Sequence, residues 1–349
     1  MQNRFPKPRH FLVCALRFIA AVAVLTLLSA MPAAAATSGG WDTAKIDGRE
    51  FVSVESIKRF YNFARLTRSG NSLVLDNQKV EMKLKIGGHE CLMNGVKFVF
   101  THKVAAIGDK AYVSRMDLAK LIDPVLRPNF IKTAGDFRTV ILDAGHGGKD
   151  PGAVNSIGTE AFYNLKVAGR TKSMLEAKGF KVVMTRSSDR FLSLQERVNL
   201  ANAVRENAIF ISIHFNSGGR EARGIETFTL SPPGVSHYGR GLIAADALAR
   251  TGNQHDSANI ALATSVHGSL LRRLQRHTFD RGIKRARFSV LSGVRHPAIL
   301  MEGGFMTHPH EARLIQNEAY QNALANGIVD AVVKYRYAVG PKNATSAPR

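Results

Sequence analysis

The feature that most constrains the fold is an alternation of short apolar runs and longer amphipathic segments from residue 139 onward. The runs at 139–142, 208–213 and 298–301 are almost entirely apolar, which is typical of strands buried on both faces. Further strands are expected at 181–185, 224–230 and 288–291, and helices at 161–178, 192–206, 259–276 and 312–335. This order predicts an α/β domain over residues 135–337, with a mostly parallel sheet flanked by helices on both faces.

A different pattern precedes this domain, at residues 41–127. Two similar blocks, 51–53 and 112–114, each run from an extended stretch into a serine that can cap a helix. Between them, residues 80–86 alternate apolar and polar side chains, which predicts a half-buried strand. The dipeptide at 94–95 is Asn-Gly, a strong hairpin signal. We therefore expect a small α+β module ahead of the larger domain.

The two ends of the chain differ from both of these parts. Residues 1–36 combine basic residues, a short apolar run at 18–30 and small residues at 33–36, the pattern of a cleavable secretory signal peptide. The apolar run is shorter than the roughly 20 residues that span a bilayer, so no stable membrane span is expected after cleavage. The protein is expected to be exported to the periplasm, the cell envelope or the medium. Residues 338–349 are small and polar and are expected to be disordered.

Charge limits the class of partner. The chain has 349 residues, with 48 Lys and Arg against 27 Asp and Glu, and a formal net charge of +21. Such a balance suits nucleic acid, an anionic membrane surface or an acidic polymer such as a cell wall. Export argues against nucleic acid. Two cysteines, one of them within the predicted signal peptide, exclude a disulfide scaffold and a Cys-rich zinc module.

Polar residues gather where the predicted strands end. In an open α/β sheet, sites form at the carboxyl ends of the strands. The residues that follow the three most apolar runs are Asp143, His146, His214, Asn216 and Glu302, with Glu160 at the start of the first helix. These residues are expected to meet at one edge of the sheet.

Two histidines and a carboxylate with an open fourth position describe a catalytic zinc site. Asp143, Glu160 and Glu302 all qualify as the carboxylate ligand, and hydrolysis needs a further carboxylate as base. Spacing alone does not choose among the three. A serine hydrolase is disfavoured because no G-x-S-x-G elbow is present. A phosphate or dinucleotide site is disfavoured because neither G-K-[ST] nor G-x-G-x-x-G follows the first strand.

At these residues the domain resembles the zinc-dependent N-acetylmuramoyl-L-alanine amidases of bacterial cell-wall turnover, of the amidase 3 type. The segments that carry the resemblance are ILDAGHGGKDPGA (141–153), TEAFYNL (159–165), TRSSDRFLSLQERVNLAN (185–202), ISIHFNS (211–217), RGIETF (223–228) and PAILMEGGFMTHP (297–309). They occur in the family's order and cover nearly the whole second domain. Residues 41–127 resemble the stalk-type N-terminal module named after copper amine oxidases, through the two serine-ended blocks and the LKIGG…MNG hairpin.

The resemblance implies a reaction and roles for residues. His146, Glu160 and His214 would bind one Zn²⁺, and Glu302 matches the catalytic glutamate. The implied reaction is hydrolysis, in peptidoglycan, of the amide between N-acetylmuramic acid and L-alanine of the stem peptide. The residues expected to support the site from outside are Asp143, Asn216, Arg186 and Asp189, with Asp143 orienting His146 or its loop. The alternative is a non-catalytic wall-binding protein that keeps the fold; absence of a key residue would favour it, and all four are present.

The sequence also departs from the family pattern. Ala161 stands where many members have Lys, and residues 307–309 read Thr-His-Pro in place of Ser-Asn-Pro. Residues 231–257 contain extra sequence that is expected to form a loop near the site rather than a long inhibitory helix. The resemblance leaves open whether an activator protein is needed. His255, His267 and His277 lie in or beside the helical stretch that follows, and most of the three are expected to be surface groups.

Overall fold

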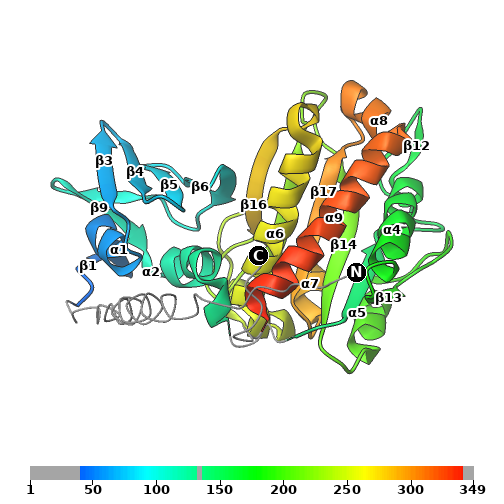
Figure 1. Ribbon diagram of the computed structural model, residues 1–349, viewed down its shortest axis with the longest axis horizontal. Helices are drawn as coiled ribbons and strands as arrows, with labels where there is room; N and C mark the ends of the chain where they lie inside the picture. The colour runs from blue at the N-terminus through cyan, green and yellow to red at the C-terminus, as the bar shows by residue number, and fades with distance from the viewer. Residues whose placement is uncertain (1–39, 132–135, 341–349) are drawn as a thin grey trace, which may run out of the picture. The chain divides into compact units, whose positions relative to one another are not determined.

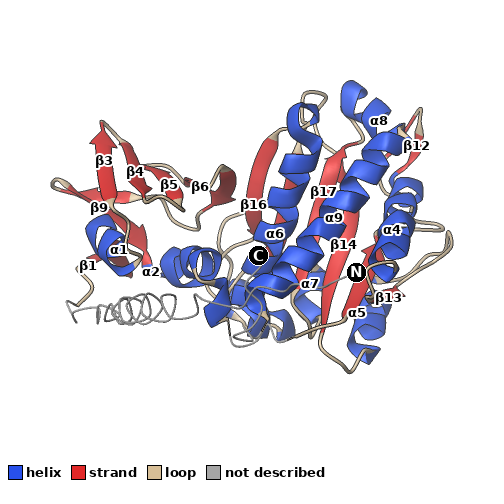
Figure 2. Cartoon of the chain, viewed as in Figure 1, coloured by secondary structure: helices blue, strands red, loops and turns tan. Residues whose placement is uncertain are grey.

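The computed structural model describes residues 40–131 and 136–340 (Figures 1 and 2). The predicted signal peptide, residues 1–36, lies outside the described residues, as does most of the predicted tail. The last helix extends to Val339, two residues into that tail. Among the described residues, no helix is both long enough and apolar enough to cross a bilayer. Contacts group the chain from Asp42 onward into one unit.

A single 11-stranded sheet forms the framework. In spatial order its strands are β13 (Lys181–Met184), β10 (Thr139–Ala144), β14 (Ala208–Asn216), β17 (Ala298–Phe305), β15 (Ile225–Leu230), β16 (Asp280–Ala286), β7 (Val96–Val99), β6 (Glu90–Met93), β5 (Glu81–Lys85), β4 (Ser72–Asp76) and β3 (Arg65–Ser69). A second sheet has the order β1 (Thr43–Ile46), β2 (Arg49–Ser53), β9 (Lys110–Ser114) and β8 (Ala105–Ile107), and β11 (Val154–Asn155) pairs with β12 (Gly158–Thr159). The three apolar runs identified in the sequence become β10, β14 and β17, which are neighbours in the large sheet.

The prediction of a mostly parallel sheet is not confirmed, because the large sheet is mixed. Strands β13, β10, β14 and β17 pair in parallel, but β15 runs antiparallel to β17. Strands β3 to β7 pair antiparallel as successive hairpins, since a short connection cannot join parallel strands. One of these turns, Asn94-Gly95, has the left-handed φ values of 50° and 76° that its dipeptide predicts.

The strand between the two halves of the sheet, β16, was not predicted. Its sequence, DRGIKRA, is charged and lacks the apolar pattern of the other strands. The strand predicted at 288–291 is wrong, because these residues enter α7 (Ser289–Gly293). Residue Ile283 of β16 pairs in parallel with Phe98 of β7. Through this contact the strands of the small module continue the sheet of the larger domain.

Helices cover both faces of the sheet between β13 and β15. The α-helices of the described residues are α1 (Val54–Phe60), α2 (Arg115–Asp117), α3 (Asp123–Leu126), α4 (Glu160–Glu176), α5 (Leu194–Ala203), α6 (Asp256–Leu274), α7 (Ser289–Gly293), α8 (Pro309–Gln316) and α9 (Glu318–Val339). Helices α4, α6 and α9 pack together on one face and lie in front of the sheet in Figure 2. On the other face, Ile141, Phe210 and Leu300 form a buried cluster with Val198 of α5 and Leu291 of α7. This part of the chain therefore has the α/β layering that the sequence predicts.

Serine caps start the helices of the small module, as predicted. The Ser53 hydroxyl accepts a hydrogen bond from the Ser56 N–H at 3.2 Å, at the start of α1. The Ser114 hydroxyl accepts one from the Asp117 N–H at 3.0 Å, at the start of α2. Both caps satisfy a backbone donor that has no partner within its own helix.

Buried polar contacts tie the small module to β16. Arg285 Nη1 lies 3.0 Å from Asp117 Oδ1, and the two side chains are 5% and 0% exposed. Asp280 accepts the Lys97 backbone N–H at 2.8 Å and contacts His267 Nε2 at 2.9 Å. His267 is fully buried and not among the surface groups, because it bridges Asp280 and a threonine of β15. These contacts supply polar partners where the two parts of the chain meet.

We expect the Asp117→Asn variant to be strongly destabilised. It leaves the buried Arg285 guanidinium without its ion-pair partner, a change that costs about 3–5 kcal/mol in other proteins. The free energy of unfolding from urea denaturation measures the effect. The control is Asp76→Asn, which breaks an ion pair with the exposed Arg65 and should leave that free energy nearly unchanged. Similar small losses in both variants would contradict the importance of the buried pair.

Candidate active site

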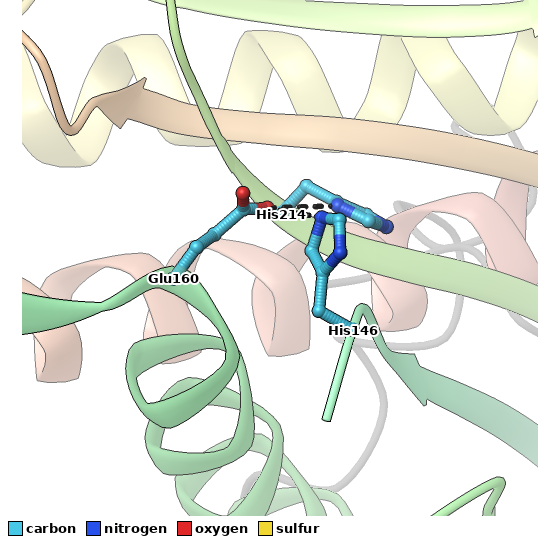
Figure 3. A group of neighbouring side chains, drawn as sticks. All are labelled: His146, Glu160 and His214. Atoms are coloured by element: carbon cyan, nitrogen blue, oxygen red, sulfur yellow. Dashed lines mark hydrogen bonds and ion pairs between the residues drawn. The ribbon is translucent and has the colours of Figure 1, made fainter. Parts of the chain in front are cut away.

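Three residues from separate segments of the chain meet beside the end of β10. Figure 3 shows His146 in the loop after β10, Glu160 as the first residue of α4 and His214 in β14. Glu160 Oε1 lies 3.2 Å from His146 Nε2 and 2.9 Å from His214 Nδ1. One nitrogen from each histidine and one carboxylate oxygen all lie within 4.8 Å of one another. The structure thus brings together the three residues expected to bind zinc.

Strand register and a glycine allow this approach. Strands β10 and β14 pair in parallel, with Ala144 opposite Ile213, so the loop after β10 starts next to His214. A side chain at Gly145 has no room, because a Cβ there would lie 2.1 Å from Cε1 of the His214 ring. Strand β14 continues past His214, and its pairing with β17 is irregular between His214 and Asn216. Such irregularities commonly redirect side chains beside active sites.

Asp150, which the sequence analysis did not select, orients His146. Its Oδ2 lies 2.8 Å from His146 Nδ1. Burial lowers the pKa of His146, but the carboxylates of Glu160 and Asp150 outweigh burial and leave it raised. A carboxylate on one ring nitrogen fixes the tautomer and leaves the other nitrogen free to bind a metal. The spacing of four residues from His146 to Asp150 is the one signal in the sequence for this pair.

Glu160 is a buried carboxylate that stays ionised. Burial raises its pKa, but contacts with His146 and His214 outweigh burial and hold the pKa well below the usual range. Glu160 also accepts the backbone N–H groups of Ala153 at 3.0 Å and Phe215 at 3.2 Å. An ionised carboxylate between two imidazoles has the donor chemistry of a site for a divalent transition metal.

Asp143 does not contact His146 directly. Its carboxylate accepts hydrogen bonds from Thr185 and Arg197 at 2.7 Å each and from Ser212 at 2.8 Å. Arg197 in turn donates to the His146 carbonyl at 2.7 Å. Asp143 therefore acts on the backbone of the His146 loop through Arg197, a residue that the sequence analysis missed. A helical arginine carries no local signal of this role.

Arg186, Asp189 and Asn216 also lie around the site. Arg186 is almost fully buried and donates to three backbone carbonyls at 2.8 Å each, two of them at the end of β10. Asp189 Oδ1 accepts the Gly148 N–H at 2.8 Å. Asn216 lines the cleft, and its carbonyl accepts the Met306 N–H at 2.8 Å. The first two side chains brace the loop that carries His146.

Glu302 lies on β17, between His214 of β14 and Glu226 of β15 in the strand register. Its side chain is buried, and its Oε2 has no hydrogen-bond partner among the described residues. Burial, followed by the nearby charges of Glu160 and Glu226, raises the pKa of Glu302 well above its usual range. Glu226 itself is paired with the buried Lys284 at 2.9 Å. Glu302 is therefore the carboxylate in this region most suited to accept a proton near neutral pH.

A cleft of about 460 Å³ gives access to these groups. Its lining residues are Asp143, Gly145, His146, Asp150, Glu160, Phe191, Leu192, Ser193, Leu194, Arg197, His214, Phe215, Asn216, Ser217, Arg287, Phe288, Ser289, Val290, Leu300 and Glu302. The insertion after β15 forms a loop with short 3₁₀ turns at Ala244–Ala247 and Thr251–His255, and no long helix precedes α6. His308, at one of the departures from the family pattern, caps α8 and does not line the cleft.

Comparisons with known proteins point to one family. The N-acetylmuramoyl-L-alanine amidase family matches residues 140–334. An uncharacterized Bacillus subtilis protein, YqiI, is 34% identical to this chain, and the match covers 57% of this chain and 84% of YqiI. The Bacillus subtilis N-acetylmuramoyl-L-alanine amidase LytC is 32% identical, but the match spans 56% of this chain and only 35% of LytC. The crystal structure of an N-acetylmuramoyl-L-alanine amidase from Clostridium difficile 630 is 33% identical, covers 57% of this chain and 97% of that chain, and has a TM-score of 0.47.

We expect Gly145→Ala to lower the affinity for zinc, used as the probe ion, by at least about tenfold, comparable to the loss of a partner that orients a ligand. The added methyl group collides with the His214 ring and displaces it from Glu160. Equilibrium dialysis measures the affinity. The control is Gly169→Ala within α4, where a Cβ meets nothing within 4 Å. Unchanged zinc affinity in Gly145→Ala would show that His214 does not need its present position to bind the ion.

Proposed function

This chain belongs to the N-acetylmuramoyl-L-alanine amidase family, and we propose that it is a peptidoglycan hydrolase. The bond cleaved is the amide between the lactyl group of N-acetylmuramic acid and L-alanine of the stem peptide. The observation that carries this proposal is the convergence of His146, Glu160 and His214 in one cleft with the buried Glu302.

The donor set fits zinc. Two imidazoles and an ionised carboxylate are the protein ligands of many catalytic zinc sites. Asp150 holds the His146 ring so that Nε2 faces Glu160. When bound, zinc polarises a carbonyl group and lowers the pKa of water to about 7. The Asp143–Arg197 pair and Arg186 keep the His146 loop in place while substrate binds.

Glu302 is the proposed general base. It takes a proton from the attacking water as the new C–O bond forms, and it gives that proton to the alanine nitrogen as the C–N bond breaks. A carboxylate with a raised pKa is a better proton acceptor near neutral pH than an ordinary one. The absence of a hydrogen-bond partner for its Oε2 among the described residues leaves that oxygen free for this role.

The proposed setting is the cell envelope. A secretory signal at residues 1–36 would place the enzyme beside peptidoglycan. Without the four basic residues of that signal the net charge is 21 − 4 = +17, which suits an anionic wall polymer. The module at 41–127 is then a stalk joined to the catalytic domain at residues 135–337. A wall-binding protein without activity would not need a proton acceptor in the cleft, so sacculus digestion separates the two hypotheses.

We expect Glu302→Gln to lower release of stem peptides from purified sacculi by about 10²–10⁴-fold. The amide keeps the size of the side chain but cannot accept the proton. Mass spectrometry of the digest identifies the bond that is cut, and atomic absorption should find zinc retained. The matched control is Glu318→Gln, at an exposed side chain paired with Arg170. Full activity of Glu302→Gln would remove Glu302 from its role, and products cut at another bond in the wild-type digest would refute the amidase proposal.

Glu302→Gln should also make the metal-free protein more stable than the wild type, and the difference should grow with pH. The raised pKa of Glu302 means that the folded state favours the protonated form, whereas the unfolded chain ionises near pH 4.3. The wild type therefore loses stability as pH rises above that value, and the glutamine variant does not. We expect little difference in melting temperature at pH 4 and a clear gain for Glu302→Gln at pH 8, with EDTA present. An equal difference at both pH values would contradict the raised pKa.

A further inference from the structure

The cleft contains an arginine that the catalytic proposal does not use. Arg287 follows β16 and precedes α7, and it lines the cleft. Among the described residues, the Lys and Arg side chains that line the cleft are Arg197 and Arg287. Arg197 is committed to Asp143 and to the His146 carbonyl. Arg287 is therefore the cleft guanidinium that has no role in the proposed reaction.

The insertion after β15 holds Arg287 in position. Arg287 Nη2 donates to the Pro232 carbonyl at 2.9 Å and to the Val235 carbonyl at 3.1 Å. Its Nε lies 3.0 Å from Asp246 Oδ1. Asp246 also pairs with Arg240 at 2.9 Å, so one carboxylate serves two guanidinium groups. The cluster keeps a surplus positive charge next to the cleft.

One nitrogen of Arg287 lacks an acceptor. The side chain is nine-tenths buried, and Nη1 has no hydrogen-bond partner within residues 40–131 and 136–340. Buried donors are nearly always paired, so an unpaired one calls for an explanation such as an absent ligand. A guanidinium remains charged in proteins, and its preferred partner is a carboxylate or a phosphate.

We propose that Arg287 binds a carboxylate on the peptide side of the scissile amide, and that the insertion at 231–257 positions it for this purpose. This inference rests on the proposed function. In that substrate the carboxyl group of the muramoyl unit is consumed in the scissile amide, so a free carboxylate close to the bond must belong to the peptide. Phe288 and Val290, which follow Arg287 along the cleft, supply an apolar surface for the small first side chain. Arg287 thus sets specificity for an acidic second residue.

The test uses two synthetic substrates that differ in one group. They are N-acetylmuramoyl-L-alanyl-D-isoglutamate, with a free α-carboxylate, and the corresponding D-isoglutamine compound, with an uncharged amide. In both, the γ-carboxyl group is blocked as a methylamide, because in the stem peptide it is joined to the third residue. Calorimetry on the zinc-loaded Glu302→Gln protein gives the Kd of each compound without turnover. Steady-state kinetics on the active enzyme gives kcat and KM separately.

We expect the acid to bind about tenfold more tightly than the amide, as one charge-assisted hydrogen bond predicts. Arg287→Gln should abolish this preference through KM, and Arg287→Lys should keep part of it, because the charge remains. Because the preference is a ratio, a partly unfolded variant does not distort it. The matched control, Arg273→Gln, removes an arginine that pairs with Asp330 and does not line the cleft, and should leave the preference unchanged.

Equal Kd values for the acid and the amide in the Glu302→Gln protein would overturn the inference, as would a preference that survives in Arg287→Gln. Hydrolysis by the active enzyme tests the amidase proposal separately from these Kd values. If the active enzyme hydrolyses neither compound and leaves sacculi intact, the amidase proposal fails, whereas the Kd ratio still decides whether Arg287 recognises a carboxylate.

Discussion

The parallel pairing of β10 with β14, and of β14 with β17, is the constraint on which the rest of the site depends. It places the loop that carries His146 beside His214, and it sets His214 opposite Glu302 in the next strand. These residues come from segments separated by about half the chain, and only strand pairing brings them together. Gly145 completes the arrangement, because its missing side chain leaves room for the His214 ring.

Burial and charge then give each carboxylate a different character. Glu160, between two imidazoles, is held ionised, whereas Glu302, without a cationic partner among the described residues, favours its proton. The charge of Asp143 is balanced by Arg197, which in turn holds the backbone of the His146 loop. One cleft therefore contains an ionised carboxylate suited to bind a metal ion and a carboxylate suited to accept a proton, both of which the proposed hydrolysis by an activated water requires. Burial of the Glu302 carboxyl disfavours its ionised form and so lowers stability near neutral pH. Functional sites commonly carry such a cost.

Local patterns predicted much of the fold and which polar residues follow its buried strands. Continuous apolar runs identified β10, β14 and β17, and the serines at 53 and 114 cap helices as expected, because these signals act within a few residues. The pattern failed at β16, whose charged side chains find their partners in distant segments, and at 288–291, which became helical. The mostly parallel sheet was not confirmed, because the module's hairpins join the same sheet through β7 and β16. No periodicity within one segment reports such a junction.

The sequence by itself determined which residue types stand at the strand ends, and hence the candidates, among them His146, Glu160, His214 and Glu302. The motifs around them indicated the family that the comparison then showed. The tertiary structure alone decided how these groups are supported and charged. It assigned Asp150 to the His146 ring, Arg197 to the loop backbone and Arg287 to the cleft. The physical reason is that hydrogen bonds and burial depend on neighbours in space, which the chain brings together only after the sheet has formed.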